Sequence, residues 1–217
     1  MKKVISKNEF LPLLQDGLTI MVGGFLTNGT PETLMDLVLE SGVKHLTIIC
    51  NDGGYPDKGV GKLISAGCVD LLIASHIGTN PKAGELMTTG EMKVRLTPQG
   101  TLVEQIRAGG AGLGGILTQT GMKTIVEEGK QMVTVDGVDY LLEKPLHADM
   151  ALLGGAIADR FGNLQYQETM RNFNPTMAFA ADTVVAEVFS IVDTLDPNAI
   201  HTPHPLVDYV LVGDHHG

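Results

Sequence analysis

The chain has 217 residues, of which 43% are hydrophobic, so it can bury one sizeable core, and residues 1–217 are expected to form a single domain. Its formal net charge of −10 argues against a nucleic-acid or anionic-membrane surface, because such partners select for clustered Lys and Arg. Two cysteines without CxxC spacing, and a basic N-terminus with no apolar run behind it, favour a cytoplasmic protein without disulfides.

The N-terminal segment predicts one strand between two helices. Apolar residues at helical spacing predict a helix over 8–15, and an aliphatic run predicts a short buried strand over 18–22. Thr30 is expected to cap the next helix, with Pro31 at its first position and the helix ending near 41–42.

The middle of the chain repeats this alternation, which predicts an α/β fold. We expect an open, mainly parallel sheet with helices on both faces. In such a sheet the ligand crevice lies outside the carboxyl ends of the strands, so the strand ends at Gly23, Asn51 and His76 are expected to contribute to one site. The predicted strands cover 45–49, 69–75 and 92–96, and the predicted helices cover 62–66 and 101–108.

The C-terminal half contains a predicted hairpin and several shorter elements. Asp136-Gly137 tolerates positive φ between two alternating runs, which predicts a β-hairpin over 131–142. The glycine-rich stretch AGGAGLGGILTQTG, from Ala108, is expected to be a loop, and the final residues VGDHHG a frayed tail. The remaining predictions are strands over 150–153 and 183–188, a turn at ADRFGN and a helix after Asn174-Pro175.

The stretch DGLTIMVGGFLTNGTP combines a strand end, a glycine pair and a helix start. Gly23-Gly24 allows a backbone or ligand to approach closely, and the helix beginning at Pro31 directs free N–H groups at the same loop. Phosphates or a developing oxyanion would suit this position. A purely structural alternative is a tight turn with Phe25 filling the core.

The same stretch resembles the signature of the α subunit of family I coenzyme A transferases. It reads Asp-Gly, two variable residues, three aliphatics, Gly-Gly-Phe, three variable residues and Gly-x-Pro. The segments LTPQGTLVEQIRAGGAGLGG, ASHIGTNP, ADRFGNL, RNFNP and IHTP resemble the same pattern in the same family. The resemblance implies a fold of the CoA-transferase/NagB-RpiA type. It also implies CoA transfer from an acyl-CoA to a free short-chain acid, nearest to the bacterial acetoacetyl-CoA:acetate or butyrate enzymes.

The resemblance also implies roles for particular residues. Gln99 corresponds to a residue whose amide reaches the active-site carboxylates, and Asn51 resembles a carboxylate-pocket residue. Both are neutral hydrogen-bond donors suited to a developing oxyanion, although a helix-start cap for Gln99 and an Asx-turn for Asn51 are structural alternatives. The segment implied to hold coenzyme A consists of Gly24, Phe25, Leu26, Thr27, Asn28, Gly29 and Thr30.

The nucleophile of this family is a glutamate in a Glu-x-Asn-Gly motif of the β subunit, and that motif does not occur in this sequence. Glu32, Glu127 and Glu128 have neighbours typical of solvated faces. The resemblance therefore implies half an enzyme, completed by a β subunit and assembled as α₂β₂. The CoA thioester is its substrate, with no permanently bound cofactor.

Two other functions remain open from the sequence. One is a non-catalytic protein of the same fold that binds an acyl-CoA or a small acid. The other is a phosphosugar isomerase or deaminase of related fold, although no convincing acid–base pair supports it. The loop from Thr118, TQTGMKT, departs from the family pattern at Gln119 and Met122-Lys123, where a preference for carbon-chain length could shift.

Other sequence features are weaker indications of chemistry. No metal site is expected, because prolines interrupt HTPHP around His201 and His204 and no further ligands complete a set. Cys50 is more consistent with a buried residue than with an acyl-accepting thiol. GAGLGG lacks the strand and helix of a dinucleotide-binding fingerprint.

Overall fold

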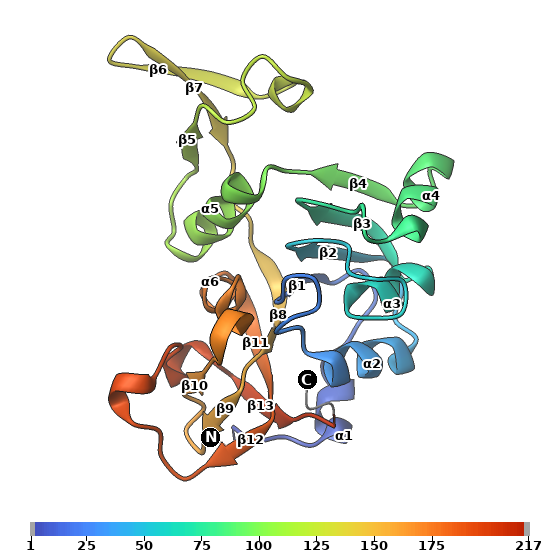
Figure 1. Ribbon diagram of the computed structural model, residues 1–217, viewed down its shortest axis with the longest axis vertical. Coiled ribbons are helices and arrows are strands. Elements are labelled where there is room, and N and C mark those ends of the chain that lie inside the picture. Colours follow the sequence, from blue (N-terminus) through green and yellow to red (C-terminus); the bar gives the residue numbers. More distant parts are fainter. Residues whose placement is uncertain (1–2, 215–217) are drawn as a thin grey trace.

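The computed structural model describes residues 3–214. Its central sheet has seven strands, and every neighbouring pair is parallel, as predicted. The strands are β1 (Thr19–Val22), β2 (Leu46–Cys50), β3 (Val69–Ala74), β4 (Lys93–Leu96), β8 (Ala148–Gly154), β11 (Ala181–Val188) and β13 (Tyr209–Val212). Their order is β13-β11-β8-β1-β2-β3-β4 (Figure 1), so the chain changes direction across the sheet between β1 and β8. Ligands bind preferentially at such a switch point.

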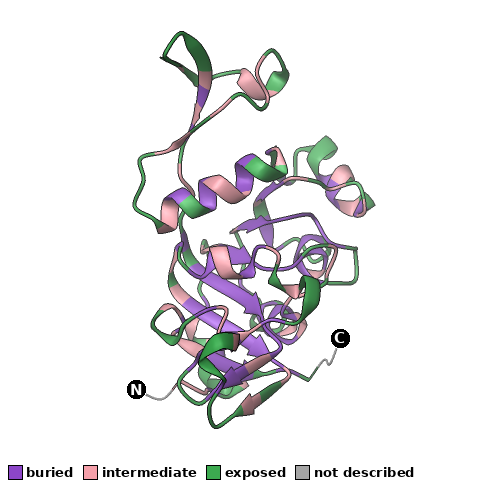
Figure 2. Cartoon of the chain, turned by 60° about the vertical axis from the view of Figure 1, so that its left-hand side comes forward, coloured by how far each residue is buried: buried purple, intermediate pink, exposed green. Residues whose placement is uncertain are grey.

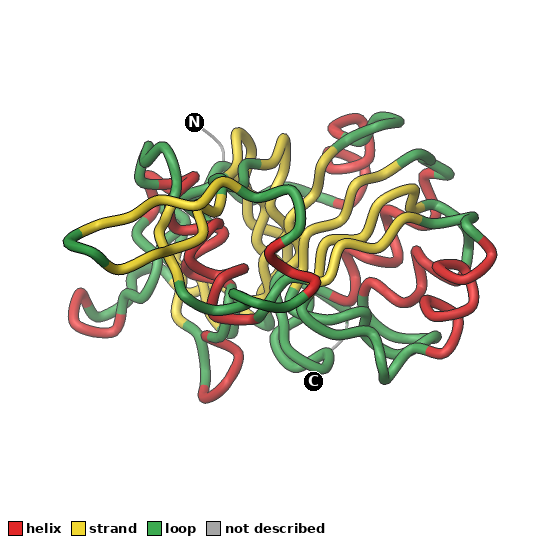
Figure 3. The backbone as a smooth tube through the Cα atoms, turned by 90° about the horizontal axis from the view of Figure 1, so that it is seen from above, coloured by secondary structure: helices red, strands yellow, loops and turns green. Residues whose placement is uncertain are grey.

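Helices cover both faces of this sheet (Figure 3). One face packs against α1 (Lys7–Phe10), α2 (Glu32–Ser41), α3 (Val60–Ser65) and α4 (Pro81–Thr89), and the other against α5 (Gln99–Gly110) and α6 (Asn174–Met177). The 3₁₀ turns are η1 (Leu11–Leu13), η2 (Ile125–Glu127), η3 (Glu168–Arg171), η4 (Pro197–Ala199) and η5 (His204–Leu206). No helix within residues 3–214 is long and apolar enough to cross a membrane.

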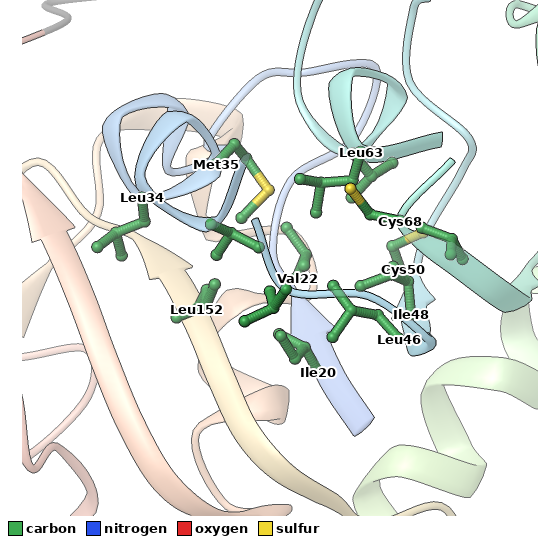
Figure 4. Close-up of a cluster of buried hydrophobic side chains, with 14 of the residues drawn as sticks. Ile20, Val22, Leu34, Met35, Leu46, Ile48, Cys50, Leu63, Cys68 and Leu152 are labelled. Carbon is green, nitrogen blue, oxygen red and sulfur yellow. The ribbon is translucent and has the colours of Figure 1, made fainter. Parts of the chain in front are cut away.

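The two hydrophobic clusters result from the alternation of side chains along the buried strands. Ile20 and Val22 of β1 point into the cluster beneath α2 and α3 (Figure 4), whereas Met21 points into the cluster beneath α5 and α6. The buried part of β1, from Ile20 to Val22, is therefore continuously apolar, as expected for a strand covered on both faces. Full burial of each such side chain contributes about 2 kcal/mol of transfer free energy.

Two smaller sheets extend from this body. One contains β9 (Ile157–Asp159), β10 (Leu164–Gln165) and β12 (Ser190–Val192). The other contains β5 (Ile116–Thr118), β6 (Gln131–Val135) and β7 (Val138–Glu143) and forms an arm that projects from the body (Figures 1 and 2). The predicted hairpin is its β6–β7 ribbon, with positive φ of 51° at Asp136 and 79° at Gly137.

The predicted helix over 8–15 is wrong in extent. The helix spans Lys7–Phe10 and tightens into the 3₁₀ turn Leu11–Leu13, because Pro12 lacks the N–H that would continue the α-helical ladder. Helix α4 was missed, although its start signal is present. Asn80 caps it by accepting from the Ala83 amide (3.2 Å), and Pro81 occupies its first turn.

The expectation of a loop from Ala108 is also corrected. Helix α5 continues to Gly110, and β5 follows within the same stretch. A Cβ at Gly109 would lie 1.9 Å from the Leu146 carbonyl oxygen, and a Cβ at Gly110 would lie 2.5 Å from Phe179 Cβ. These glycines therefore allow close packing of an ordered helix.

The predicted frayed tail is wrong for its described part. Val212 ends β13, the Gly213 amide donates to the Val188 carbonyl (3.0 Å), and the Asp214 amide donates to Thr33 Oγ1 (2.9 Å). The remainder of the predicted tail, 215–217, lies outside the described residues.

Candidate active site

The segment after β1 folds into a tight hairpin turn. Backbone hydrogen bonds join Phe25 and Asn28 in both directions, with N–O distances of 3.0 and 2.9 Å. Leu26 and Thr27 between them have positive φ angles of 47° and 68°, the pattern of a type I′ turn. The Leu26 amide also donates to Asp52 Oδ2 beyond the end of β2 (2.9 Å). We call residues 24–30 the signature loop.

The two glycines before this turn allow side chains to approach the backbone. A Cβ at Gly23 would lie 1.7 Å from Asn174 Oδ1, and a Cβ at Gly24 would lie 1.9 Å from Thr30 Oγ1. Phe25 is 44% exposed, so the alternative in which it fills the core is wrong. The glycine pair is required by close contacts with protein side chains.

Thr30 does not cap α2, which corrects the prediction. Its hydroxyl instead donates to the Gly23 carbonyl (3.2 Å) and closes the signature loop, so that Pro31 becomes the N-cap. One N–H group of the first turn, that of Leu34, donates to Glu187 Oε2 (2.9 Å). The helix terminus is thus partly satisfied by a buried carboxylate of the protein.

Two asparagines, Asn172 between η3 and α6 and Asn174 at the first position of α6, hold the signature loop from the side opposite Asp52. Asn172 Oδ1 accepts from the Gly24 amide (3.1 Å), and Asn172 Nδ2 donates to the Asn28 carbonyl (2.9 Å). Asn174 Nδ2 donates to the Gly29 carbonyl (3.0 Å), 145 residues away in the sequence. Sequence reasoning included RNFNP only as part of the family pattern and missed these contacts.

The structure brings Gln99 and Asn51 together. Gln99 Nε2 donates to Asn51 Oδ1 at 3.2 Å. Gln99 is exposed at the first position of α5, and Asn51 is only 2% exposed after β2. Because Asn51 Oδ1 accepts this bond, its amide N–H₂ is directed away from Gln99 and can donate to another group. The pair forms a chain of two neutral amides.

The structural alternatives for these two residues are not what the structure shows. Gln99 makes no side-chain cap to α5, and the Asx-type turn belongs to Asp52, whose Oδ1 accepts from the Gly54 amide (2.9 Å). The Asn51 carbonyl instead accepts from the amide and hydroxyl of Ser75 (2.8 and 2.7 Å). The ends of β2 and β3 are therefore joined, and a bridge between Asp52 and His76 continues the contact.

A groove of about 1090 Å³ borders the signature loop. Residues 26–32 form one wall, residues 167, 168 and 170 contribute another, and Gly154 and Gly155 mark the end of β8. The groove therefore lies at the β1/β8 switch point. Neither Asn51 nor Gln99 lines it. Its lining has five acidic residues and two lysines, namely Glu32, Asp57, Glu168, Glu187, Asp214, Lys58 and Lys62.

The glutamates with the most shielded side chains are all engaged in the fold. Glu32 accepts from Lys62 Nζ (2.8 Å) with a 20% exposed side chain, so its assignment to a solvated face is corrected. Burial lowers the pKa of Lys62, but hydrogen bonds to Asp36 and Glu32 outweigh this and raise it. Glu143 and Glu187 are 4% and 5% exposed; Glu143 pairs with Lys130, and Glu187 accepts from α2 as described above.

Cys50 and His201 are both engaged in the fold. Burial, followed by the nearby Asp52 charge, raises the pKa of the Cys50 thiol well above its ordinary value, which disfavours the nucleophilic thiolate. His201 Nδ1 accepts from the Tyr166 amide (2.9 Å), and the two rings stack with centroids 6.1 Å apart. No group of three or more potential metal ligands exists in the described part of the chain.

Comparison with known proteins agrees with this architecture. The chain is 52% identical over 212 residues to "Acetate CoA-transferase subunit alpha" of Escherichia coli (strain K12), covering 97% of this chain and 96% of that protein. It is 49% identical over 211 residues to "Acetoacetyl-CoA:acetate/butyrate CoA transferase alpha subunit" of Clostridium acetobutylicum, covering 96% of this chain and 97% of that protein.

A solved structure extends the comparison to three dimensions. The acyl-CoA transferase YdiF of Escherichia coli O157:H7 superposes with a TM-score of 0.88 at 25% identity, covering 97% of this chain. Our chain spans only 46% of the YdiF chain. The model of the family "Coenzyme A transferase" matches residues 7–213. The chain therefore belongs to the coenzyme A transferase family.

Proposed function

We propose that this chain is the α subunit of a two-chain CoA transferase for short-chain acids of the acetate, acetoacetate and butyrate class. In this proposal an acyl-CoA and a free carboxylic acid are its substrates, and no cofactor is permanently bound. A β subunit completes a cytoplasmic α₂β₂ enzyme. The names of the relatives, both α subunits of such enzymes, support this assignment.

The observation that carries the proposal is the hydrogen bond from Gln99 to Asn51 beside the signature loop. It orients neutral amide donors at the carboxyl edge of the sheet without adding a positive charge that would tie up a carboxylate nucleophile. A preorganised donor of this kind contributes about 3 kcal/mol to the stabilisation of an oxyanion in other enzymes. We therefore assign Asn51 and Gln99 to stabilising the tetrahedral species formed during acyl transfer.

The reaction requires a carboxylate nucleophile, which we place in the β subunit. This glutamate attacks the thioester carbonyl, the C–S bond breaks, and CoA leaves as a thiolate while an anhydride forms. The thiolate then attacks the glutamyl carbonyl of the anhydride, which releases the first acid and leaves CoA on the glutamate as a thioester. The second acid reverses both steps. No oxidant, reductant or metal is needed.

The engagement of buried glutamates supports placing this nucleophile in a partner. Glu143 and Glu187 already accept from Lys130 and the Leu34 amide. The arm adds a second argument, because apolar side chains are exposed along it and such surfaces mark protein interfaces. These residues are Leu117 (41% exposed), Ile125 (81%), Met132 (45%), Val135 (42%) and Val138 (40%).

The charge of the groove suggests which part of coenzyme A meets the signature loop. With five acidic residues and two lysines, the lining repels the phosphates of the nucleotide end. The neutral pantetheine arm and thioester carry no such penalty. We therefore assign the signature loop to the pantetheine–thioester segment and the phosphates to a position outside this groove.

The acceptor class is tested by measuring CoA transfer from acetoacetyl-CoA to acetate, butyrate and succinate with the assembled enzyme. Preference for the monocarboxylic acids supports the proposal, and preference for succinate contradicts the acid class. Titrating the isolated chain with CoA tests the binding-protein alternative. Tight binding by the isolated chain, together with no transfer by the assembled pair, would favour that alternative.

A further inference from the structure

The turn at the tip of the signature loop is strained by its own sequence. Leu26 and Thr27 occupy the two central positions with φ of 47° and 68°. Type I′ turns favour Asn-Gly or Gly-Gly at these positions, because side chains with a Cβ disfavour positive φ and β-branched ones do so most strongly. The sequence Phe-Leu-Thr-Asn would not select this turn without help. Something outside the turn therefore holds it.

Asn172 closes the base of this turn with a single amide. Its Oδ1 accepts from the Gly24 amide (3.1 Å), and its Nδ2 donates to the Asn28 carbonyl (2.9 Å). Gly24 and Asn28 flank the turn on its two sides, so one side chain fixes the separation of both strands of the hairpin. Asp52 holds the remaining Leu26 amide from the opposite side.

The amide of Asn172 is itself fixed in orientation. Its Oδ1 also accepts from the Phe173 amide (2.7 Å), and its Nδ2 also donates to the Thr169 carbonyl (2.9 Å). Thr169 Oγ1 accepts in turn from Asn28 Nδ2 (2.5 Å). Asn174 Nδ2 also donates to Asn172 Oδ1 (3.4 Å). Each end of the Asn172 side chain therefore has partners both in its own segment and in the signature loop.

We propose that Asn172 is a positioning residue that holds the strained Leu26–Thr27 turn in the shape that receives the acyl-CoA. The inference rests on the proposed function of the signature loop. Asn172 does not touch the reacting carbonyl. It holds the loop, before acyl-CoA binds, in the conformation that the loop has in the complex. Binding then does not have to offset the entropy lost on ordering the loop.

The test uses the assembled α–β enzyme carrying Asn172→Ala. We expect the KM for acyl-CoA to rise about tenfold, with kcat and the KM for the acceptor acid changed less than about twofold. Asn172→Asp is a second variant, which keeps the acceptor for Gly24 but directs a carboxylate oxygen at the Asn28 carbonyl. It should raise the same KM. The matched control is Asn198→Ala, since Asn198 bonds Asp196 on an exposed turn, and all its constants should remain unchanged.

A rescue variant separates positioning from general support of the fold. Thr27→Gly makes positive φ favourable at the second central position. In the Asn172→Ala background it should return the KM for acyl-CoA at least halfway, on a logarithmic scale, to the wild-type value. If Asn172 only supports the fold, Thr27→Gly leaves the elevated KM unchanged or raises it further, and the proposal is overturned.

Amide hydrogen exchange of the same enzyme reports the turn itself. We expect the amide of Asn28 to lose protection in Asn172→Ala and to regain it in the double variant. Unchanged protection together with an unchanged KM for acyl-CoA overturns the inference. The wild-type rate in the same assay reports separately on the proposed function, because a wild-type enzyme that transfers no CoA would refute that function whatever the turn does.

Discussion

Replacing Gly23 with alanine probes the contact between the end of β1 and α6. The new Cβ would lie 1.7 Å from Asn174 Oδ1 and 2.5 Å from its Cγ, far inside van der Waals contact. Gly23 has no positive φ, so the perturbation is purely steric. The clash cannot be relieved cheaply, because Asn174 is 0% exposed and has no room to turn.

The magnitude follows from the hydrogen bonds that Asn174 must give up. Its Oδ1 accepts from the Gly154 amide (3.0 Å), and its Nδ2 donates to the carbonyls of Gly29 (3.0 Å) and Met170 (2.8 Å). At a net value of about 1 kcal/mol each, losing these bonds lowers the free energy of unfolding by about 3 kcal/mol. For a chain of this size that corresponds to a fall in Tm of about 9 °C.

Urea and thermal unfolding of Gly23→Ala measure this effect. Gly84→Ala is the matched control, because Gly84 lies in α4 with nothing within 4 Å of a new Cβ, and it should stabilise by about 0.5 kcal/mol. In the Asn174→Ala background, Gly23→Ala should cost almost nothing further, since the clash is gone. A loss below about 0.5 kcal/mol for Gly23→Ala alone, or full additivity in the double variant, would refute this reasoning.

Three further outcomes are expected. Gln99→Ala should lower kcat of the assembled enzyme about 100-fold with little change in the free energy of unfolding. Gln15→Ala, at an exposed position, is the control and should leave kcat unchanged. Unchanged turnover in Gln99→Ala would exclude a role of Gln99 in stabilising the oxyanion. Burial lowers the pKa of His201, so the unfolded chain binds a proton more readily than the folded chain. The free energy of unfolding should therefore fall as pH drops below about 6.5. In a plot of Tm against pH, the part of this fall that is due to His201 should be absent in His201→Gln. Gly109→Ala places a Cβ 1.9 Å from the Leu146 carbonyl and should destabilise by about 2 kcal/mol in urea unfolding; a neutral result would show that α5 can move away from that segment.

Local patterns predicted six of the seven strands of the central sheet and most of its helices, but not the edge strand β13. Aliphatic runs located β1 to β4, and the Asp136-Gly137 turn located the β6–β7 ribbon, because both signals are contained within a few neighbouring residues. Helix α4 had an equally local signal in Asn80-Pro81 and was nevertheless missed. Gly109 and Gly110 were predicted to lie in a loop but belong to the end of α5. Their tight packing against Leu146 and Phe179 depends on segments distant in the sequence, so local patterns do not reveal it. The expectation of a single domain stays a prediction.

The candidate site was predictable only where a family pattern supplied it. Asn51 and Gln99 would each have been assigned a local structural role from the residues alone, and their hydrogen bond joins positions 48 apart in the sequence. Asn172 and Asn174 lie about 145 positions from the loop they hold. No periodicity or local propensity encodes such pairings, because they arise only when strands that are distant in the sequence become neighbours in the sheet.

The most direct test of the account is CoA transfer from acetoacetyl-CoA to acetate, measured with the purified chain alone and after co-expression with a β subunit. We predict no transfer by the chain alone and transfer by the pair, because we place the nucleophilic glutamate in the partner. Transfer by the chain alone would contradict the account. It would direct attention to Glu187, the buried carboxylate that lines the groove.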